Sequence, residues 1–181
     1  GSVTAMLKTL ADDGLIDHQL HYGATLTEKG RNLAVHVVRR HRIVELFLVK
    51  VLGMGWDEVH KEAEQLEHVV SDDVIDRMDD LLGHPTIDPH GDPIPTRDGS
   101  LPMRSLVRLA YCKEGECVSI ARIGDQDTKF LKFAEEQGLT LGSKVDIIHR
   151  NESADSITIR SSGHEIILGL SAAGRIEVEY T

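Results

Sequence analysis

The chain has 181 residues, of which 40% are hydrophobic, so it can bury an ordinary core in one large or two small domains and is not a disordered chain. No apolar run approaches the about 20 residues of a membrane span, and its two cysteines, Cys112 and Cys117, supply neither a disulfide framework nor a metal motif. We therefore expect a cytoplasmic protein without a membrane partner.

The net charge of −10 is unevenly distributed, so it does not by itself exclude nucleic acid as a partner. Residues 1–55 carry a net charge of +2, residues 56–104 of −9 and residues 105–181 of −3. The acidic middle predicts a site for cations or for a protein partner, while the first third can still face phosphates.

The first part of the chain predicts the second half of a winged helix-turn-helix. Apolar residues recur at helical spacing over residues 3–13, and Gly14 ends this helix. Strand-like segments at 15–18 and 24–27 flank a turn at 21–23, although a generic α/β fragment would show the same pattern. A helix-turn-helix needs a helix before its recognition helix, so we expect about two further helices before this one.

Three more helices follow in the apolar pattern, over residues 28–52, 56–70 and 71–82. Three arginines lie near the middle of the first: Arg39, Arg40 and Arg42. These arginines either reach a DNA backbone or are simply solvated. The helices are apolar on more than one face, which indicates either a dimer interface or a compact monomeric bundle.

The second of these helices carries the most distinctive group of side chains. On an ideal helix, two histidines and two glutamates fall within an arc of about 100° beside the apolar stripe: His60, Glu64, Glu67 and His68. Imidazoles and carboxylates at the edge of a buried face are costly unless something compensates them. A divalent cation would do so, and a ladder of solvated charges is the alternative.

A stretch at residues 83–104 predicts a domain boundary, because it holds all five prolines of the chain. After it the pattern changes to period two, which predicts short strands. These strands cover residues 117–121, 144–148, 156–159, 165–168 and 175–179. A helix over 128–137 interrupts them, and we expect a small β-barrel.

Several motifs, in their order and spacing, make the chain resemble the diphtheria toxin repressor family of metal-dependent transcriptional regulators. The motifs are VTAMLK (3–8), LTEKGR (26–31), RHR (40–42), VH (59–60), EHVVSDDV (67–74) and PHGDPIP (89–95). The resemblance implies a multidomain fold, mainly α and then β. It places a partial winged helix-turn-helix at 1–27, a helical metal-binding and dimerisation domain at 28–95, a linker at 96–104 and an SH3-like small β-barrel at 105–181.

The resemblance also implies two metal half-sites. The family's ancillary site falls on His41, Glu45 and His60. Its primary site falls on Glu64, Glu67 and His68, with a further ligand from a helix that precedes this chain. Iron-responsive members have a cysteine at the first of these primary-site positions. This chain has Glu64 there, as members of the manganese-responsive branch do. Because a carboxylate is a harder ligand than a thiolate, Mn²⁺ is favoured over Fe²⁺, and other divalent transition metals can bind in vitro.

The chain departs from a pure manganese pattern, because it keeps His60 and has an SH3-like domain. Whether its two sites are separate or form a bridged pair is therefore open. In some members the SH3-like domain lends a carboxylate and an amide, and these positions match Asp125 and Gln126, with Asp127 as their neighbour. An N-cap turn before the helix at 128–137 is the competing interpretation.

DNA contacts fall by the same resemblance on six residues, four on the recognition helix and two at the wing tip: Ser2, Thr4, Ala5 and Lys8, and His21 and Tyr22. We expect a homodimeric repressor that is activated by Mn²⁺ or Fe²⁺, binds operator DNA and controls metal-ion homeostasis genes, without enzyme activity or a small-molecule substrate.

Three alternatives stand beside this prediction. One is a repressor that responds to iron and not to manganese. Another is a metallohydrolase, although no HExxH-type motif or nucleophile is visible. The last is an SH3-type interaction module, although few aromatic residues are present to line its groove.

Overall fold

The computed structural model describes residues 2–19 and 22–180. Its helices are α1 Val3–Asp12, α2 Glu28–Lys50, α3 Val59–Leu66, α4 Asp72–Leu81, α5 Thr128–Glu136 and α6 Leu170–Ala173, with a 3₁₀ turn η1 at Leu109–Tyr111. Its strands are β1 Ile16–Gln19, β2 Gly23–Leu26, β3 Val107–Arg108, β4 Cys117–Ile123, β5 Lys144–Asn151, β6 Ser156–Ser161, β7 His164–Gly169 and β8 Ile176–Tyr180. Within the described ranges no helix is long and apolar enough to cross a membrane.

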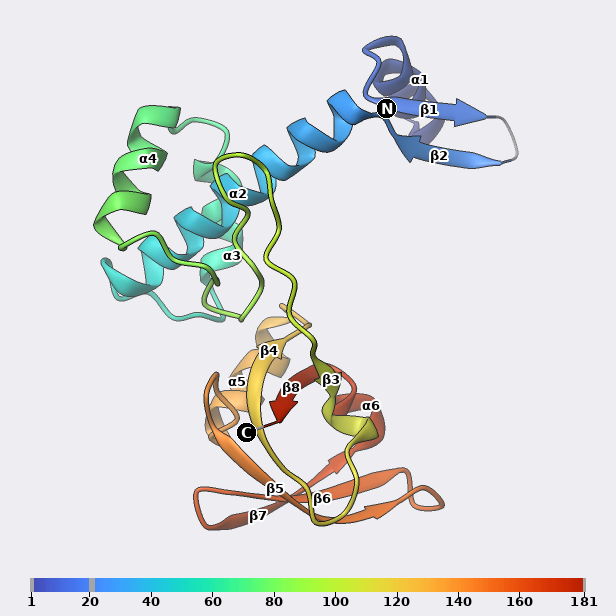
Figure 1. The fold of residues 1–181 in the computed structure, drawn as a ribbon, viewed down its shortest axis with the longest axis vertical. Coiled ribbons are helices and arrows are strands. Elements are labelled where there is room, and N and C mark those ends of the chain that lie inside the picture. The colour runs from blue at the N-terminus through green and yellow to red at the C-terminus, as the bar shows by residue number, and fades with distance from the viewer. Residues whose placement is uncertain (1, 20–21, 181) are drawn as a thin grey trace.

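The N-terminal helix and hairpin lie at one end of the long helix α2 (Figure 1). α1 begins at Ser2, whose hydroxyl accepts a hydrogen bond from the Ala5 amide, and β1 and β2 pair antiparallel. α2 begins at Thr27, whose hydroxyl caps the Gly30 amide. A Cβ at Gly30 would lie 1.9 Å from the Leu15 carbonyl oxygen, so only glycine allows α2 to start against the β1 turn. This helix and hairpin confirm the predicted half of a winged helix-turn-helix.

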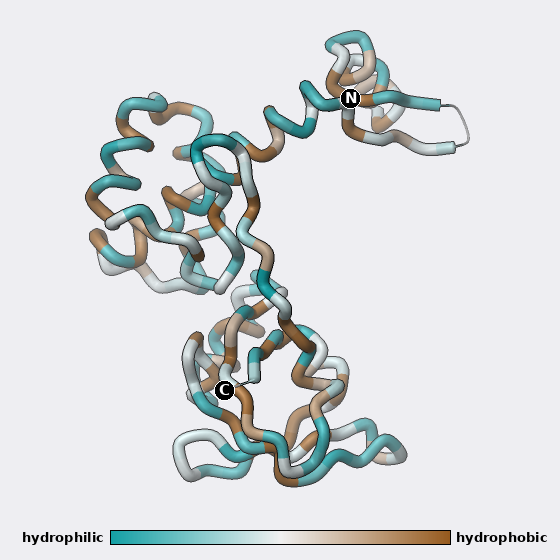
Figure 2. Tube along the Cα trace, viewed as in Figure 1, coloured by the Kyte–Doolittle hydropathy of each residue, from teal (hydrophilic) through white to brown (hydrophobic). Residues whose placement is uncertain are grey.

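The other half of α2 packs with α3 and α4 around a shared apolar core, and hydrophilic and hydrophobic residues alternate along α2 and α4 (Figure 2). The buried members of this core are Ile43, Val44, Leu46, Leu48, Val59, Ala63, Ile75 and Ile94. Burial of such a stripe, more than helix propensity, stabilises helices as short as α3 and α4.

Arg39, Arg40 and Arg42 of α2 are not simply solvated, because each is paired with a carboxylate of the chain. Arg39 pairs with Asp79 of α4 at 2.8 Å and donates to a proline carbonyl oxygen, and Arg40 pairs with Asp72. Arg42 pairs with Asp92. Their role is therefore to tie α2 to α4 and to the segment that follows it.

The helix expected over residues 56–70 is shorter than its apolar spacing predicts. α3 ends at Leu66, and the amides of Val69 and Val70 both bond to the Leu66 carbonyl oxygen in a turn. Glu67 and His68 therefore lie at and beyond the end of the helix, and the ideal arc of four side chains does not persist. Spacing alone did not reveal this, because a tight turn continues the apolar contacts of a helix.

The proline-rich segment is not a free linker along its first half. Asp88, His90, Asp92 and Ile94 are buried, and the His90 carbonyl oxygen accepts a hydrogen bond from the Ile123 amide at 2.8 Å. This part of the segment therefore lies between the helices and the C-terminal sheet, and it contributes buried polar side chains.

The C-terminal sheet has the strand order β3-β8-β4-β5-β6-β7, and every neighbouring pair is antiparallel. All five predicted strands and the helix α5 are present, and the fold is of the predicted SH3-like kind. Among the described strands β3 and β7 do not pair, so the sheet is open and not a closed barrel. β3 has two residues, too few for an alternating pattern to be visible in the sequence.

Candidate metal centre

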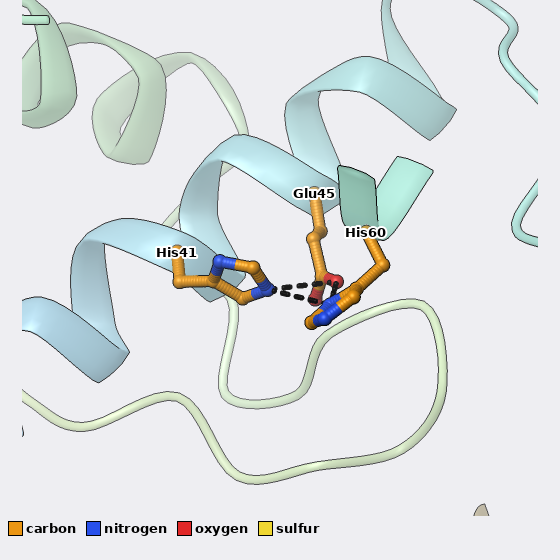
Figure 3. A group of neighbouring side chains, drawn as sticks. All are labelled: His41, Glu45 and His60. Atoms are coloured by element: carbon orange, nitrogen blue, oxygen red, sulfur yellow. Dashed lines mark hydrogen bonds and ion pairs between the residues drawn. The ribbon is translucent and has the colours of Figure 1, made fainter. Parts of the chain in front are cut away.

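His41, Glu45 and His60 converge where α3 crosses α2 (Figure 3). The helix places His41 and Glu45 one turn apart on the same face, and His41 Nε2 lies 3.0 Å from Glu45 Oε1. His60 Nδ1 lies 3.0 Å from His41 Nε2 and 3.2 Å from Glu45 Oε1. The predicted ancillary group is therefore brought together, with three nitrogen and oxygen donors close enough to share one cation.

The protonation states of this group depend on one another. Burial by itself would raise the pKa of Glu45, but hydrogen bonds and charges from His41, and from His90 and His60, outweigh it and lower that pKa. Burial by itself would lower the pKa of His41, yet Glu45 and Glu67 raise it. A carboxylate that is fully buried and held in its charged form by imidazoles is suited to a cation that displaces their protons.

A second buried group uses the other oxygen of Glu45. Asp88, His90 and Glu45 are all buried, and Glu45 Oε2, Asp88 Oδ2 and His90 Nδ1 have no hydrogen-bond partner. His90 Nδ1 lies 4.0 Å from Glu45 Oε2. The Nε2–H of His90 donates to the Trp56 carbonyl oxygen at 2.8 Å, which leaves the lone pair of Nδ1 facing the group. Buried polar atoms without partners are costly, and a divalent cation would satisfy all three.

Asp88 itself is held in an unfavourable environment for a charge. Its Oδ1 accepts hydrogen bonds from the amides of His90 and Asp92, and Arg42 Nε lies 3.8 Å from Oδ2, beyond hydrogen-bond distance. Burial, with the charge of Asp92, raises the pKa of Asp88 to about 6. Asp88 and His90 are not among the ligands predicted from the sequence, although His90 and Asp92 lie in the motif at residues 89–95. The signal was there: an Asp-x-His pair in a rigid Pro-Gly turn.

The predicted primary group is only partly assembled. Glu67 Oε2 lies 2.6 Å from His41 Nδ1, and Glu64 Oε1 lies 3.6 Å from His60 Nε2. The side chain of His68 is 74% exposed and lies 3.3 Å from Glu67 Oε1. A cavity of about 270 Å³ is lined by Glu64 and Glu67 of this group together with four other candidate ligands: His41, Glu45, His60 and Gln126. His68 does not line that cavity.

The three candidates from the loop before α5 have different surroundings. Gln126 lines the cavity beside His60 and Glu67. Asp125 pairs with Arg175 at 2.9 Å. Asp127 caps α5, because its carboxylate accepts from the amides of Lys129 and Phe130, so for this residue the N-cap interpretation is correct.

A third cluster, of Asp79, Asp80 and His84, is better explained as an ion-pair network. Arg39 and Arg97 already neutralise its carboxylates, at 2.8 Å and 3.2 Å. A cation there would meet two guanidinium groups, which disfavours a metal.

The predicted DNA-contact residues lie on the exposed side of the N-terminal part. Thr4, Ala5 and Lys8 are exposed on α1, and Tyr22 is 88% exposed at the hairpin tip. Ser2 is the N-cap of α1. His21 lies outside the described residues.

Comparison with known proteins covers both halves of the chain. A family described as "Iron dependent repressor, metal binding and dimerisation domain" matches residues 27–96, and the FeoA domain matches residues 107–180. The iron-dependent repressor IdeR of Mycobacterium bovis is 45% identical over 191 residues, which cover 98% of this chain and 82% of that protein. The diphtheria toxin repressor of Corynebacterium glutamicum is 31% identical over 186 residues, which cover 97% of this chain and 81% of that protein.

Solved structures agree over nearly the whole chain. A manganese-dependent transcriptional repressor in complex with manganese superposes with a TM-score of 0.91 at 42% identity, covering 98% of this chain and 83% of that one. ScaR with bound Zn²⁺ superposes with a TM-score of 0.83 at 34% identity, and the match covers 99% of this chain and 84% of that one. The fold of nearly the whole chain thus recurs in these repressors, and the chain belongs to the diphtheria toxin repressor family of metal-dependent transcriptional regulators.

Proposed function

We propose that the chain is a metal-activated, DNA-binding transcriptional repressor that responds to Mn²⁺ or Fe²⁺ and controls genes of metal-ion homeostasis. The observation that carries the proposal is the fully buried Glu45 between two sets of donors, His41 and His60 on one side and Asp88 and His90 on the other. Relatives named as iron-dependent and as manganese-dependent repressors support the same assignment.

The proposed ligands form two adjoining sites. The first takes Glu45, Asp88 and His90. The second takes His41, His60, Glu64, Glu67 and His68, with Gln126 at its edge and Glu45 shared. Such a shared carboxylate would couple the two sites, because two cations would either compete for its oxygens or be bridged by them.

The chemistry of the donors favours Mn²⁺ within this proposal. All proposed ligands are imidazole nitrogens or oxygens, and both cysteines lie outside the two groups. Such ligands suit Mn²⁺ and Fe²⁺, while softer thiolates would favour other ions. Zn²⁺ and Cd²⁺ are bound in structures of the relative ScaR, and Zn²⁺ is expected to bind this chain more tightly than Mn²⁺ in vitro.

Metal would act by linking parts of the molecule. The proposed ligands come from α2, α3, the segment at 88–90 and the loop before α5, so a bound cation would hold these parts in one arrangement. In a homodimer this arrangement would set the distance between two copies of α1, which carries Thr4, Ala5 and Lys8. We place the residues that contact operator DNA there and at the hairpin tip.

Binding of operator DNA by the complete protein, with and without Mn²⁺, tests the proposal. We expect at least about tenfold tighter binding with Mn²⁺, the lower range of allosteric coupling. Equal affinity in both conditions would refute metal activation. In the same assay Glu45→Gln is expected to lose the effect of Mn²⁺. Glu62→Gln is its matched control and should keep that effect, because Glu62 is exposed on α3 and lies outside both groups.

A further inference from the structure

A cavity of about 620 Å³ is lined by residues of β3, η1, β4, β5, α6 and β8 and of the turns that adjoin them. Its charged lining residues are four arginines and two carboxylates: Arg108, Arg122, Arg150, Arg175, Asp125 and Glu177. The lining therefore has a net charge of +2 in a chain whose net charge is −10. None of the predicted functions uses this concentration of arginine.

The four arginines are unequally neutralised. Arg122 is paired with Asp92 at 2.8 Å and with Glu177 at 3.1 Å, and Arg175 is paired with Asp125. Arg150 donates through Nε to the Ala110 carbonyl oxygen and pairs with Glu152, whose side chain is 76% exposed and therefore screened by water.

Arg108 has no such partner. Across residues 2–19 and 22–180, its guanidinium forms no hydrogen bond or ion pair with a side chain, and its neighbour across the β3–β8 pair is Glu177, which is already held by Arg122. Arg108 thus brings positive charge into the cavity that no carboxylate of the described residues balances, and the charge of Arg150 is balanced only by the exposed Glu152.

We propose that this arginine-rich cavity binds a small polyanion with two or more carboxylate or phosphate groups. Guanidinium groups bind both kinds of oxyanion through paired, charge-assisted hydrogen bonds. The volume lies in the range of small-molecule sites, about 300–1,000 Å³, and exceeds what a single phosphate fills. Arg108 is the anchor, because its donors are uncommitted, and Arg150 is the second contact.

Calorimetric titration of the metal-free chain tests this site independently of the repressor function. The probes are citrate for a carboxylate ligand and pyrophosphate for a phosphate ligand, with glycerol as a neutral control. Metal is removed with an immobilised chelating resin, since a soluble chelator is itself a polyanion. We expect saturable binding of one molecule per chain for at least one probe, and none for glycerol; which probe binds identifies the chemical class.

Arg108→Gln is expected to weaken that binding by about tenfold, the loss of one charge-assisted contact. The variant should fold normally, because Arg108 is exposed and unpaired. Arg160→Gln is the matched control, an exposed arginine of the same sheet outside the cavity, and should bind like the parent chain. Absence of saturable binding for both probes, or equal affinities of Arg108→Gln and Arg160→Gln, would overturn the proposal.

Discussion

At the scale of single residues, Glu45 is the centre of the proposed metal site. Its Oε1 faces the two imidazoles of His41 and His60, and its Oε2 faces the buried pair Asp88 and His90. A buried carboxylate usually has arginine or lysine as its partner. Here its partners are imidazoles, which can give up their protons to the solvent and keep a lone pair for a metal.

Replacing Glu45 with Gln is expected to weaken Mn²⁺ binding at least about tenfold, because a neutral amide oxygen is a poorer ligand than a carboxylate for a hard cation. Calorimetric titration of the metal-free protein measures the effect. Glu62→Gln should bind Mn²⁺ like the parent chain. Equal affinities of the two variants would remove Glu45 from the site.

Asp88→Asn is expected to change stability and metal binding in opposite directions. Asp88 is a buried carboxylate with one unpartnered oxygen, so an amide of the same shape, whose NH₂ faces acceptor atoms, should make the metal-free protein more stable by about 1–3 kcal/mol. The increase in Tm on adding Mn²⁺ should shrink. A fall in metal-free Tm together with an unchanged Mn²⁺ increment would contradict the assignment.

At the scale of elements, α2 organises the helical half of the molecule. It extends from the N-terminal hairpin to the metal site and binds α4 through the buried pair Arg39–Asp79. Burial by itself would raise the pKa of Asp79, but hydrogen bonds from His84 and Arg39 and their charges outweigh it and lower that pKa. The Asp79 carboxylate therefore binds a proton more weakly in the folded state than in the unfolded chain.

Because the pKa of Asp79 is lower in the folded state, the stability that Asp79 contributes is present above about pH 4. It is lost as the pH falls through the lowered pKa. Asp79→Asn should cost about 3 kcal/mol near pH 7, since it leaves Arg39 buried without its partner, and the difference from the parent chain should narrow below pH 4. The free energy of unfolding of both metal-free proteins, measured by urea unfolding at a series of pH values, tests this prediction.

Asp73→Asn is the control on the same helix. Asp73 and its partner Arg77 are both exposed, so this change should cost little at any pH. A cost for Asp79→Asn that does not depend on pH would mean that the carboxylate charge is not the source of the stability.

At the scale of the whole molecule, the segment at 88–94 joins the helical half to the sheet. Asp92 pairs with Arg42 of α2 and with Arg122 of β4. Beside it, a Cβ at Gly91 would lie 2.2 Å from the Ala121 carbonyl oxygen, and Gly91 has a φ of 90°. The backbone of the segment is thus pressed against β4, and the same segment presents Asp88 and His90 to Glu45.

Gly91→Ala should therefore weaken Mn²⁺ binding by about tenfold or more although no ligand is changed, because the clash separates the segment from β4 and misplaces His90. Mn²⁺ titration with limited proteolysis of the segment measures the change. Gly99→Ala is the matched control: Gly99 also has a positive φ, but its added Cβ would meet only a side-chain carbon at 3.7 Å. Equal losses in both variants would assign the effect to backbone strain alone.

Local patterns predicted much of the fold. Helix α5 and the five longer strands appear where the 3.6-residue and two-residue periods place them, and the one-turn spacing of His41 and Glu45 put both on one face of α2. These features depend on residues a few positions apart. The short strand β3 and the early end of α3 were not predictable in this way, because two residues show no period and a turn preserves the apolar spacing.

The sequence by itself determined the order of elements, the family and most of the proposed ligands. Only the tertiary structure decided that Asp88 and His90 face Glu45, that Asp125 pairs with Arg175, and that Arg39 and Arg42 of α2 bind carboxylates within the chain. These contacts join residues about 40 or more positions apart. Nothing in local spacing specifies them, because they follow from how the segment at 88–94 packs between two cores, and that packing depends on all the buried surfaces at once.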